Sequence, residues 1–228
     1  MTGVVVLSGS LGASAAMWEP QVGALARRFH VVPSEHPGHG GAPMVPVTDV
    51  ADLARLLLAR IEADRFSFVG LSLGGAIGLR IALDEPERVE RLVLCSTAAR
   101  FAAGYRERAT IVRAEGLESV VDSVLERWFT PSFADVQRYR EMLLSTDPEG
   151  YARCCEAVAA WDVRGRLGAL RVPTLCIAGG DDPVTPPAAL RELAAEIPHA
   201  SVLVLPRARH LANVERAAEF NAALLGHL

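Results

Sequence analysis

The sequence predicts an α/β protein built on a mainly parallel sheet that is flanked by helices. Short runs rich in Val, Leu and Ile lack polar alternation, which is typical of strands buried on both faces. Amphipathic segments with helical periodicity separate these runs, and that alternation indicates parallel strands joined by helices. The chain has 228 residues, of which 50% are hydrophobic and 22% charged, so it can bury one substantial core. We therefore expect a single folding unit.

Six apolar runs are the expected strands, at residues 4–9, 31–35, 66–70, 91–97, 174–180 and 201–206. Between and after them, helices are expected at residues 50–63, 76–89, 188–197 and 217–228. Helices that lie between strands in the chain can serve as crossover connections between parallel strands. The two patterns together favour a sheet with helices on both faces.

One interval, residues 98–170, interrupts this alternation because it contains no convincing strand. Helical patterns occur at 116–129 and 135–144, with turn-forming residues after each. We interpret 98–170 as a helical cap inserted into a core formed by 1–97 and 171–228. It contains no Gly/Ser-rich linker, so we expect it to pack on the core.

Composition excludes several classes of function. The net charge of −4 offers no basic field for nucleic acid, and all 23 basic residues are arginine, which excludes a lysine Schiff base or a P-loop lysine. The four cysteines show no metal-ligand spacing and are expected to be buried, reduced thiols. The first residues form neither a signal peptide nor a membrane span, so we expect a cytoplasmic protein that binds no membrane.

The stretch FSFVGLSLGGAIG places Ser72 between an expected strand and an expected helix. It contains the G-x-S-x-G pattern of a nucleophile elbow, although that pattern also arises by chance in glycine-containing chains. In such a turn Gly70 and Gly74 face neighbouring backbone, where a side chain would collide. The turn lifts the hydroxyl out of the sheet, and the helix behind it contributes a positive dipole end. Ser72 is therefore the candidate nucleophile.

A serine nucleophile needs a general base and an acid that orients the base. In this architecture the acid and then the histidine follow later strands. Asp181 and Asp182 follow the strand at 174–180, and His210 follows the strand at 201–206. We predict Asp182 as the acid because it directly precedes Pro183, with Asp181 as the alternative. His210 is the predicted base.

The developing oxyanion requires two N–H donors. One is expected from Leu73, directly after the nucleophile, and the other from Ser10 in the loop after the first strand. That loop lacks the full G-x-G-x-x-G spacing of a dinucleotide site. His36 and His39 could suggest a metal pair, but no carboxylate–histidine cluster completes a metal site, which favours a structural loop.

Several stretches make the chain resemble α/β-hydrolases, and within them most closely the 3-oxoadipate enol-lactonase family. The resemblance covers nearly the whole chain and is carried by residues 7–22, 70–82, 86–100, 124–133, 147–158 and 178–187. It implies a hydrolase without cofactor or metal that opens a small-molecule enol-lactone. Such a substrate carries a carboxylate, so Arg127 or Arg153 is expected to anchor it. Trp128 is either a further substrate contact or a core residue.

The chain departs from that family in two places. Family members usually carry two antiparallel strands before the first strand seen here, whereas Val4 begins that strand almost at once. The strand at 31–35 is therefore expected at a sheet edge, and its unpaired backbone groups predict self-association into a homo-oligomer, although Pro33 interrupts the row of donors. The second departure is Pro37, where the family tends to have arginine.

Three other functions are compatible with these residues. A generalist carboxylesterase and a cofactor-free haloperoxidase or perhydrolase would use the same three side chains, and only substrate screening separates them. A non-catalytic receptor on this fold would bind a lactone without turnover. The presence of Ser72, Asp182 and His210 argues against a receptor.

Overall fold

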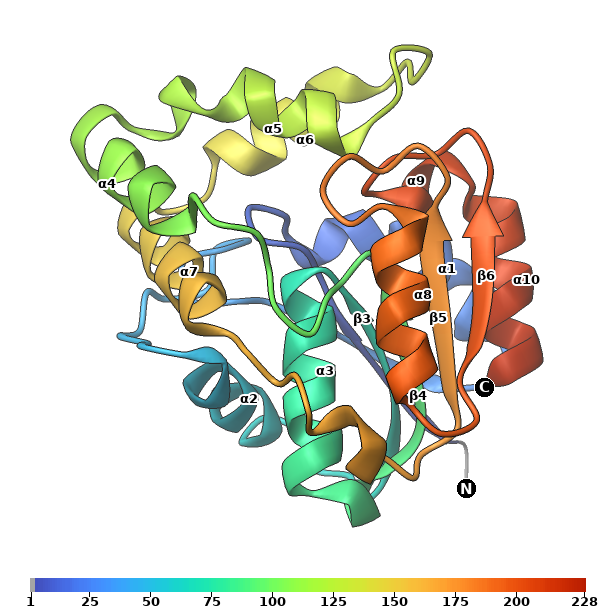
Figure 1. Cartoon of the computed structure of the whole chain (residues 1–228). Coiled ribbons are helices and arrows are strands. Elements are labelled where there is room, and N and C mark those ends of the chain that lie inside the picture. The colour runs from blue at the N-terminus through green and yellow to red at the C-terminus, as the bar shows by residue number, and fades with distance from the viewer. Residues whose placement is uncertain (1–2) are drawn as a thin grey trace.

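The computed structural model describes residues 3–228 and contains the expected six-stranded parallel sheet (Figure 1). The strand order is β2-β1-β3-β4-β5-β6, and every neighbouring pair is parallel. The strands are β1 (Val4–Ser8), β2 (His30–Ser34), β3 (Phe66–Leu71), β4 (Val89–Cys95), β5 (Thr174–Gly179) and β6 (Ser201–Leu205). The α/β fold class is thus confirmed. Every residue of β3 and β5 is buried, which explains their continuous apolar sequence.

Helices cover both faces of the sheet. One face carries α2 (Val50–Leu58), α3 (Leu73–Asp84) and α8 (Pro187–Glu196), and the other carries α1 (Glu19–Leu25) and α10 (Ala217–His227) (Figure 1). A short helix, α9 (Ala212–Glu215), precedes α10. The apolar sides of these helices and the strands form one hydrophobic core. Among residues 3–228 no helix has the length and apolar character needed to cross a membrane.

Between β4 and β5 the chain forms four helices that lie beyond the carboxyl ends of the strands (Figure 1). They are α4 (Tyr105–Glu115), α5 (Val121–Trp128), α6 (Val136–Leu144) and α7 (Pro148–Ala160). Sequence periodicity indicated α5 and α6 but not α4, which buries only Ala109 and Val112. We call the region from α4 to α7 the cap. Its helices supply one wall of the candidate site described below.

The strand β2 forms one edge of the sheet, as expected. The His30 N–H donates to the Gly3 carbonyl at 2.9 Å, so alternate residues of β2 face β1. Val31 and Pro33 therefore turn their backbone groups outward, and proline has no N–H to donate. The outward side of β2 is left with the Val31 N–H as its donor. Self-association through this edge stays a prediction.

Candidate active site

Ser72 lies at a strained turn between β3 and α3. Its φ of 58° falls in the left-handed region that side chains rarely adopt. The Ser72 N–H donates to the Cys95 carbonyl at 2.8 Å, and the Thr97 hydroxyl donates to the Ser72 carbonyl at 2.8 Å. The end of β4 thus holds the serine from both sides. Backbone strain of this kind persists only where surrounding contacts enforce it.

Two glycines make the turn sterically feasible. A Cβ on Gly70 would lie 2.3 Å from the Gly74 carbonyl oxygen, and a Cβ on Gly74 would lie 2.0 Å from the Ser8 carbonyl oxygen. Both distances are far below van der Waals contact, and the opposing atoms belong to backbone that cannot move aside. Glycine at these positions brings the first turn of α3 directly against the end of β1.

The loops after β5 and β6 bring Asp182 and His210 together. His210 Nδ1 donates to Asp182 Oδ2 at 2.9 Å, and both residues are buried. Burial alone would raise the pKa of Asp182, but the electrostatic attraction of His210 and hydrogen bonds from His210, the Thr185 hydroxyl and the Val184 N–H outweigh it and lower that pKa. The carboxylate therefore stays ionised and orients the ring. Its neighbour Asp181 is exposed.

The predicted oxyanion donors come from two segments of the chain. Leu73 is the first residue of α3, and Ser10 lines the same cavity as Ser72 and His210. In the described part of the chain neither backbone N–H has a backbone acceptor, so both are free to bind an anion. The Gly74 N–H donates to the Gly9 carbonyl at 3.0 Å, which ties the loop of Ser10 to the helix of Leu73.

Two buried histidines form hydrogen bonds with the backbone around Ser10. His36 Nε2 donates to the Gly9 carbonyl at 3.0 Å. His39 Nδ1 donates to the Pro37 carbonyl at 2.9 Å, so His39 Nε2 is left to accept the Gly12 N–H at 3.0 Å. Burial, helped by His36, lowers the pKa of His39 to about 3 and keeps it neutral. Both rings are thus engaged with backbone, and no metal-binding cluster of side chains occurs within residues 3–228.

The same histidine loop touches the cap. The Asp147 N–H donates to the Gly38 carbonyl at 2.8 Å, directly before α7 begins. A Cβ on Gly150 would lie 2.8 Å from the Cα of Gly38, so the two backbones are in direct contact. Residues 36–39 therefore connect the oxyanion loop to the cap.

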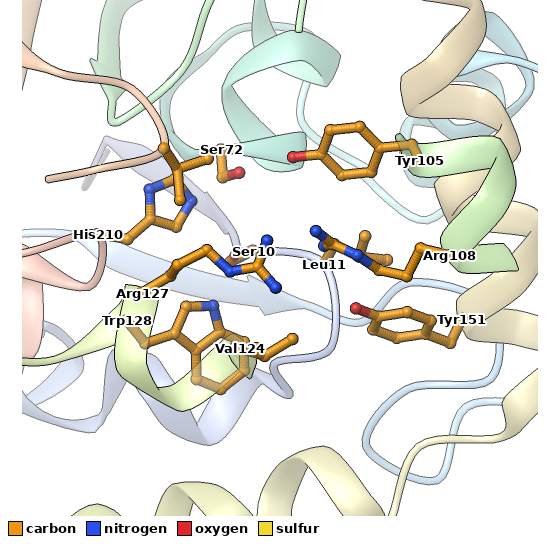
Figure 2. A pocket seen from close by; sticks show the side chains of 11 residues that line it. Ser10, Leu11, Ser72, Tyr105, Arg108, Val124, Arg127, Trp128, Tyr151 and His210 are labelled. Carbon is orange, nitrogen blue, oxygen red and sulfur yellow. The ribbon is translucent and has the colours of Figure 1, made fainter. Parts of the chain in front are cut away.

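Ser72 and His210 open into a cavity that residues of the cap also line (Figure 2). Its remaining walls are formed by Ser10, Leu11, Tyr105, Arg108, Val124, Arg127, Trp128, Tyr151 and Val184. Figure 2 shows the guanidinium groups of Arg108 and Arg127 pointing toward each other across this space. The cavity thus combines the candidate nucleophile and the candidate base with two cations.

Neither cation of the cavity is neutralised by the protein. Among residues 3–228 neither Arg108 nor Arg127 forms an ion pair, whereas nearby cap arginines such as Arg113 and Arg153 do. Arg127 Nε donates to the Ser123 carbonyl at 2.7 Å, which directs its side chain along α5. Burial and repulsion from Arg108 lower the pKa of Arg127, whereas interactions with Tyr151 and Tyr105 outweigh burial and raise the pKa of Arg108.

The structure brings most of the predicted site residues together but excludes one of them. Ser72, His210, Ser10, Arg127 and Trp128 all line the cavity, and Asp182 lies behind His210. Arg153 does not line the cavity. It pairs with Glu149 at 2.8 Å on α7, so it is removed as a candidate anchor. Trp128 is buried and also packs edge-on against Phe129, so it serves both core and cavity.

Six residues that line the cavity were missed in the sequence. Three of them are polar or charged, Tyr105 and Arg108 on α4 and Tyr151 on α7, and the other three are Leu11, Val124 and Val184. The start of α7 carries a readable signal, because Asp147 caps the helix by accepting the Gly150 N–H at 2.8 Å and Pro148 follows. The largely polar sequence of α4 carries no comparable signal.

Comparison with known proteins agrees with this geometry. A family model described as alpha/beta hydrolase fold matches residues 3–217. The 3-oxoadipate enol-lactonase 2 of Acinetobacter baylyi is 34% identical over 96% of this chain and 86% of its own length. A protein named putative carbamate hydrolase RutD from Agrobacterium fabrum is 32% identical over 98% of this chain and 92% of its own length.

A solved structure gives the same result in three dimensions. The crystal structure of the enol-lactonase from Burkholderia xenovorans LB400 superposes with a TM-score of 0.96 at 36% identity, covering 100% of this chain and 91% of that one. The resemblance drawn from sequence motifs is therefore confirmed. With its parallel sheet, its strained serine turn and these relatives, the chain belongs to the alpha/beta hydrolase fold family and is a hydrolase.

Proposed function

We propose that this protein opens a small, carboxylate-bearing enol-lactone through a covalent acyl-enzyme on Ser72. The observation that carries the proposal is the pair of unpaired arginines, Arg108 and Arg127, inside the cavity of Ser72. Two confined cations repel each other, and an anionic substrate group between them relieves that repulsion. The names of the enol-lactonase relatives supply the substrate class.

Polar side chains in the lining of the cavity also support a substrate with a polar end. Tyr105 and Tyr151 add hydroxyl groups to the wall opposite Ser72, where they can orient the substrate's polar end.

The proposed reaction begins with attack of Ser72 Oγ on the lactone carbonyl carbon, while His210 Nε2 takes the hydroxyl proton. The N–H groups of Leu73 and Ser10 bind the oxyanion of the tetrahedral intermediate. When the intermediate collapses, the ring C–O bond breaks and the enol oxygen leaves with the proton from His210. The enol then becomes a ketone, which makes ring opening favourable.

The acyl-enzyme is then hydrolysed by the same residues in reverse roles. His210 deprotonates a water molecule, which attacks the acyl carbon, and the proton returns to Ser72 Oγ as the ester bond breaks. The product gains a carboxylate. Asp182 holds the imidazole through both steps and stabilises its cation.

Hydrolysis of 3-oxoadipate enol-lactone, measured beside p-nitrophenyl acetate and a small carbamate, tests the proposal. We expect kcat/KM for the lactone to exceed that for either alternative by at least ~100-fold, about 2.7 kcal/mol of transition-state stabilisation. The methyl ester of the lactone's side-chain carboxylate is the matched control, and it should lose most of this advantage. Equal or better turnover of p-nitrophenyl acetate would refute the lactonase proposal, and preference for the carbamate would redirect it toward the RutD-like relatives.

A further inference from the structure

The loop that carries His210 is hydrogen-bonded to the end of the cap helix α5. The His210 N–H donates to the Arg127 carbonyl at 3.3 Å, and the Leu211 N–H donates to the Trp128 carbonyl at 3.1 Å. The Arg209 guanidinium donates to the Phe129 carbonyl at 3.2 Å. The last carbonyls of a helix have no partner within it, so the histidine loop satisfies them here.

One carboxylate completes this connection. Glu215, the last residue of α9, accepts the Arg209 N–H with Oε2 at 2.7 Å. Its Oε1 accepts both the Thr130 N–H at 2.9 Å and the Thr130 hydroxyl at 2.6 Å. Glu215 therefore joins the residue before His210 to the residue that follows the cap segment of Arg127, Trp128 and Phe129.

The two connected segments hold different parts of the site. The segment at 127–130 presents Arg127 and Trp128 to the cavity, and the segment at 209–211 presents His210. Every residue from 127 to 130 forms at least one hydrogen bond with the histidine loop or with Glu215. Since backbone hydrogen bonds fix the position of one segment relative to the other, the base and the substrate-facing side chains form one unit.

We propose that Glu215 is a positioning residue that keeps His210 in register with Ser72 and with the substrate-binding residues of α5. It touches neither substrate nor the reacting atoms. The roles of His210 and Arg127 in this inference rest on the function proposed above. Because a displacement of about 1 Å in a catalytic group can cost about 100-fold in rate, loss of three hydrogen bonds beside His210 is expected to lower kcat.

The test compares Glu215→Ala and Glu215→Gln with Glu219→Gln as the matched control. Glu219 is exposed on α10 and pairs with Arg216, away from the histidine loop. Two substrates are used, the enol-lactone and p-nitrophenyl acetate, which has no carboxylate for Arg127. Melting temperatures are recorded for each variant so that stability and rate are separated.

For Glu215→Ala we expect kcat to fall about 10- to 100-fold with both substrates, while KM for p-nitrophenyl acetate changes less than about 2-fold. The kcat of Glu215→Gln should fall less. The amide oxygen of the glutamine still accepts the Arg209 N–H, whereas its amide N–H₂ faces the Thr130 donors. Glu219→Gln should match the wild type. This partial rescue distinguishes a positioning role from a general loss of packing.

A lower melting temperature with unchanged kcat for both substrates would overturn the proposal, because Glu215 would then serve stability alone. If Glu215→Ala does not fold, the test rests on Glu215→Gln. A kcat of Glu215→Gln equal to that of the wild type then refutes the inference. Failure of the proposed function has a different signature. In that case the wild type hydrolyses p-nitrophenyl acetate but not the lactone, and the Glu215 comparison is still read from p-nitrophenyl acetate.

Discussion

The serine turn and the cap hold their functional groups by opposite means. At the turn, Gly70 and Gly74 bring backbone against backbone, so the position of Ser72 is set mainly by backbone contacts, with one hydrogen bond from the Thr97 side chain. In the cap, Arg108 and Arg127 reach the cavity on long side chains from separate helices. Those helices are held partly by ion pairs at the surface, such as Arg113 with Glu149 and Glu156, each at 2.6 Å.

The comparison separates the region proposed to hold the nucleophile from the region proposed to bind the substrate. In the proposed reaction the backbone-enforced turn positions Ser72 Oγ, which forms and breaks bonds, and almost any added side chain there causes a collision. The cap supplies the charged and bulky side chains around the cavity, and substitutions can change these side chains without disturbing the sheet. Relatives with different substrates in their names, enol-lactones and carbamates, share this fold with the present chain.

Ser72→Ala is expected to have the largest effect on activity. Removing the nucleophile should lower kcat by about 10⁶-fold if the residues act as other serine triads do. A serine of the cap surface, Ser119, provides the control variant Ser119→Ala, which should keep full activity. Substantial residual turnover by a folded Ser72→Ala protein would mean that water attacks the lactone directly.

Asp182→Asn is expected to lower kcat by about 10⁴-fold, because an amide can hold the wrong tautomer of His210. Asp181→Asn is the matched control, one residue away but exposed and without contact to His210. Steady-state kinetics of the two variants decide between the adjacent aspartates. Greater damage from Asp181→Asn would assign the acid to that residue instead.

Gly74→Ala tests the backbone contact at the turn. Its methyl group would lie 2.0 Å from the Ser8 carbonyl oxygen, so we expect destabilisation of about 3 kcal/mol or more together with loss of activity. Gly23→Ala, within α1 and with no atom near its added methyl group, should instead be neutral or stabilise by roughly 0.5–1 kcal/mol. Denaturant unfolding measures both, and equal effects would contradict the contrast between core and surface glycines.

Arg108→Met and Arg127→Met should act on binding rather than on chemistry. Each is expected to raise KM for the anionic lactone about 10- to 100-fold, since a hydrogen bond to a charged group contributes roughly 1.5–3 kcal/mol. Turnover of p-nitrophenyl acetate should stay within about 2-fold of wild type. Arg153→Met, which alters an arginine outside the cavity, should leave both substrates unaffected. A fall in p-nitrophenyl acetate turnover would place these arginines in the chemical step.

The smallest effect at neutral pH is expected from His39→Gln, whose amide oxygen can still accept the Gly12 N–H. In the folded protein His39 does not bind a proton until its pKa of about 3, whereas the unfolded chain binds one below the ordinary value of 6.5. The unfolded state is therefore favoured as pH falls from 6.5 toward 3, by at most about 1.4 kcal/mol per pH unit. Removing this titration should make acid unfolding shallower, and an unchanged pH dependence would contradict the assignment.

Much of the candidate catalytic centre could be predicted because its residues follow strand ends. Ser72, Asp182 and His210 each come within five residues of a strand end, and parallel strands bring those ends to one edge of the sheet. Arg108 and Glu215 could not be found in this way, since their partners lie far away in the chain. The sequence alone could have excluded Arg153 as a substrate anchor, because it follows Glu149 by four residues. That spacing favours an ion pair on the helix surface.

The contact between Gly38 and Gly150 bears on how such caps can be exchanged between relatives. It sets the distance of α7 from the oxyanion loop without using any side chain. A transplanted cap therefore needs this junction, glycine against glycine with the Asp147 N–H bonded to Gly38, together with the hydrogen bonds that join residues 127–130 to the His210 loop and to Glu215. The cap surfaces outside these two junctions are the ones open to redesign.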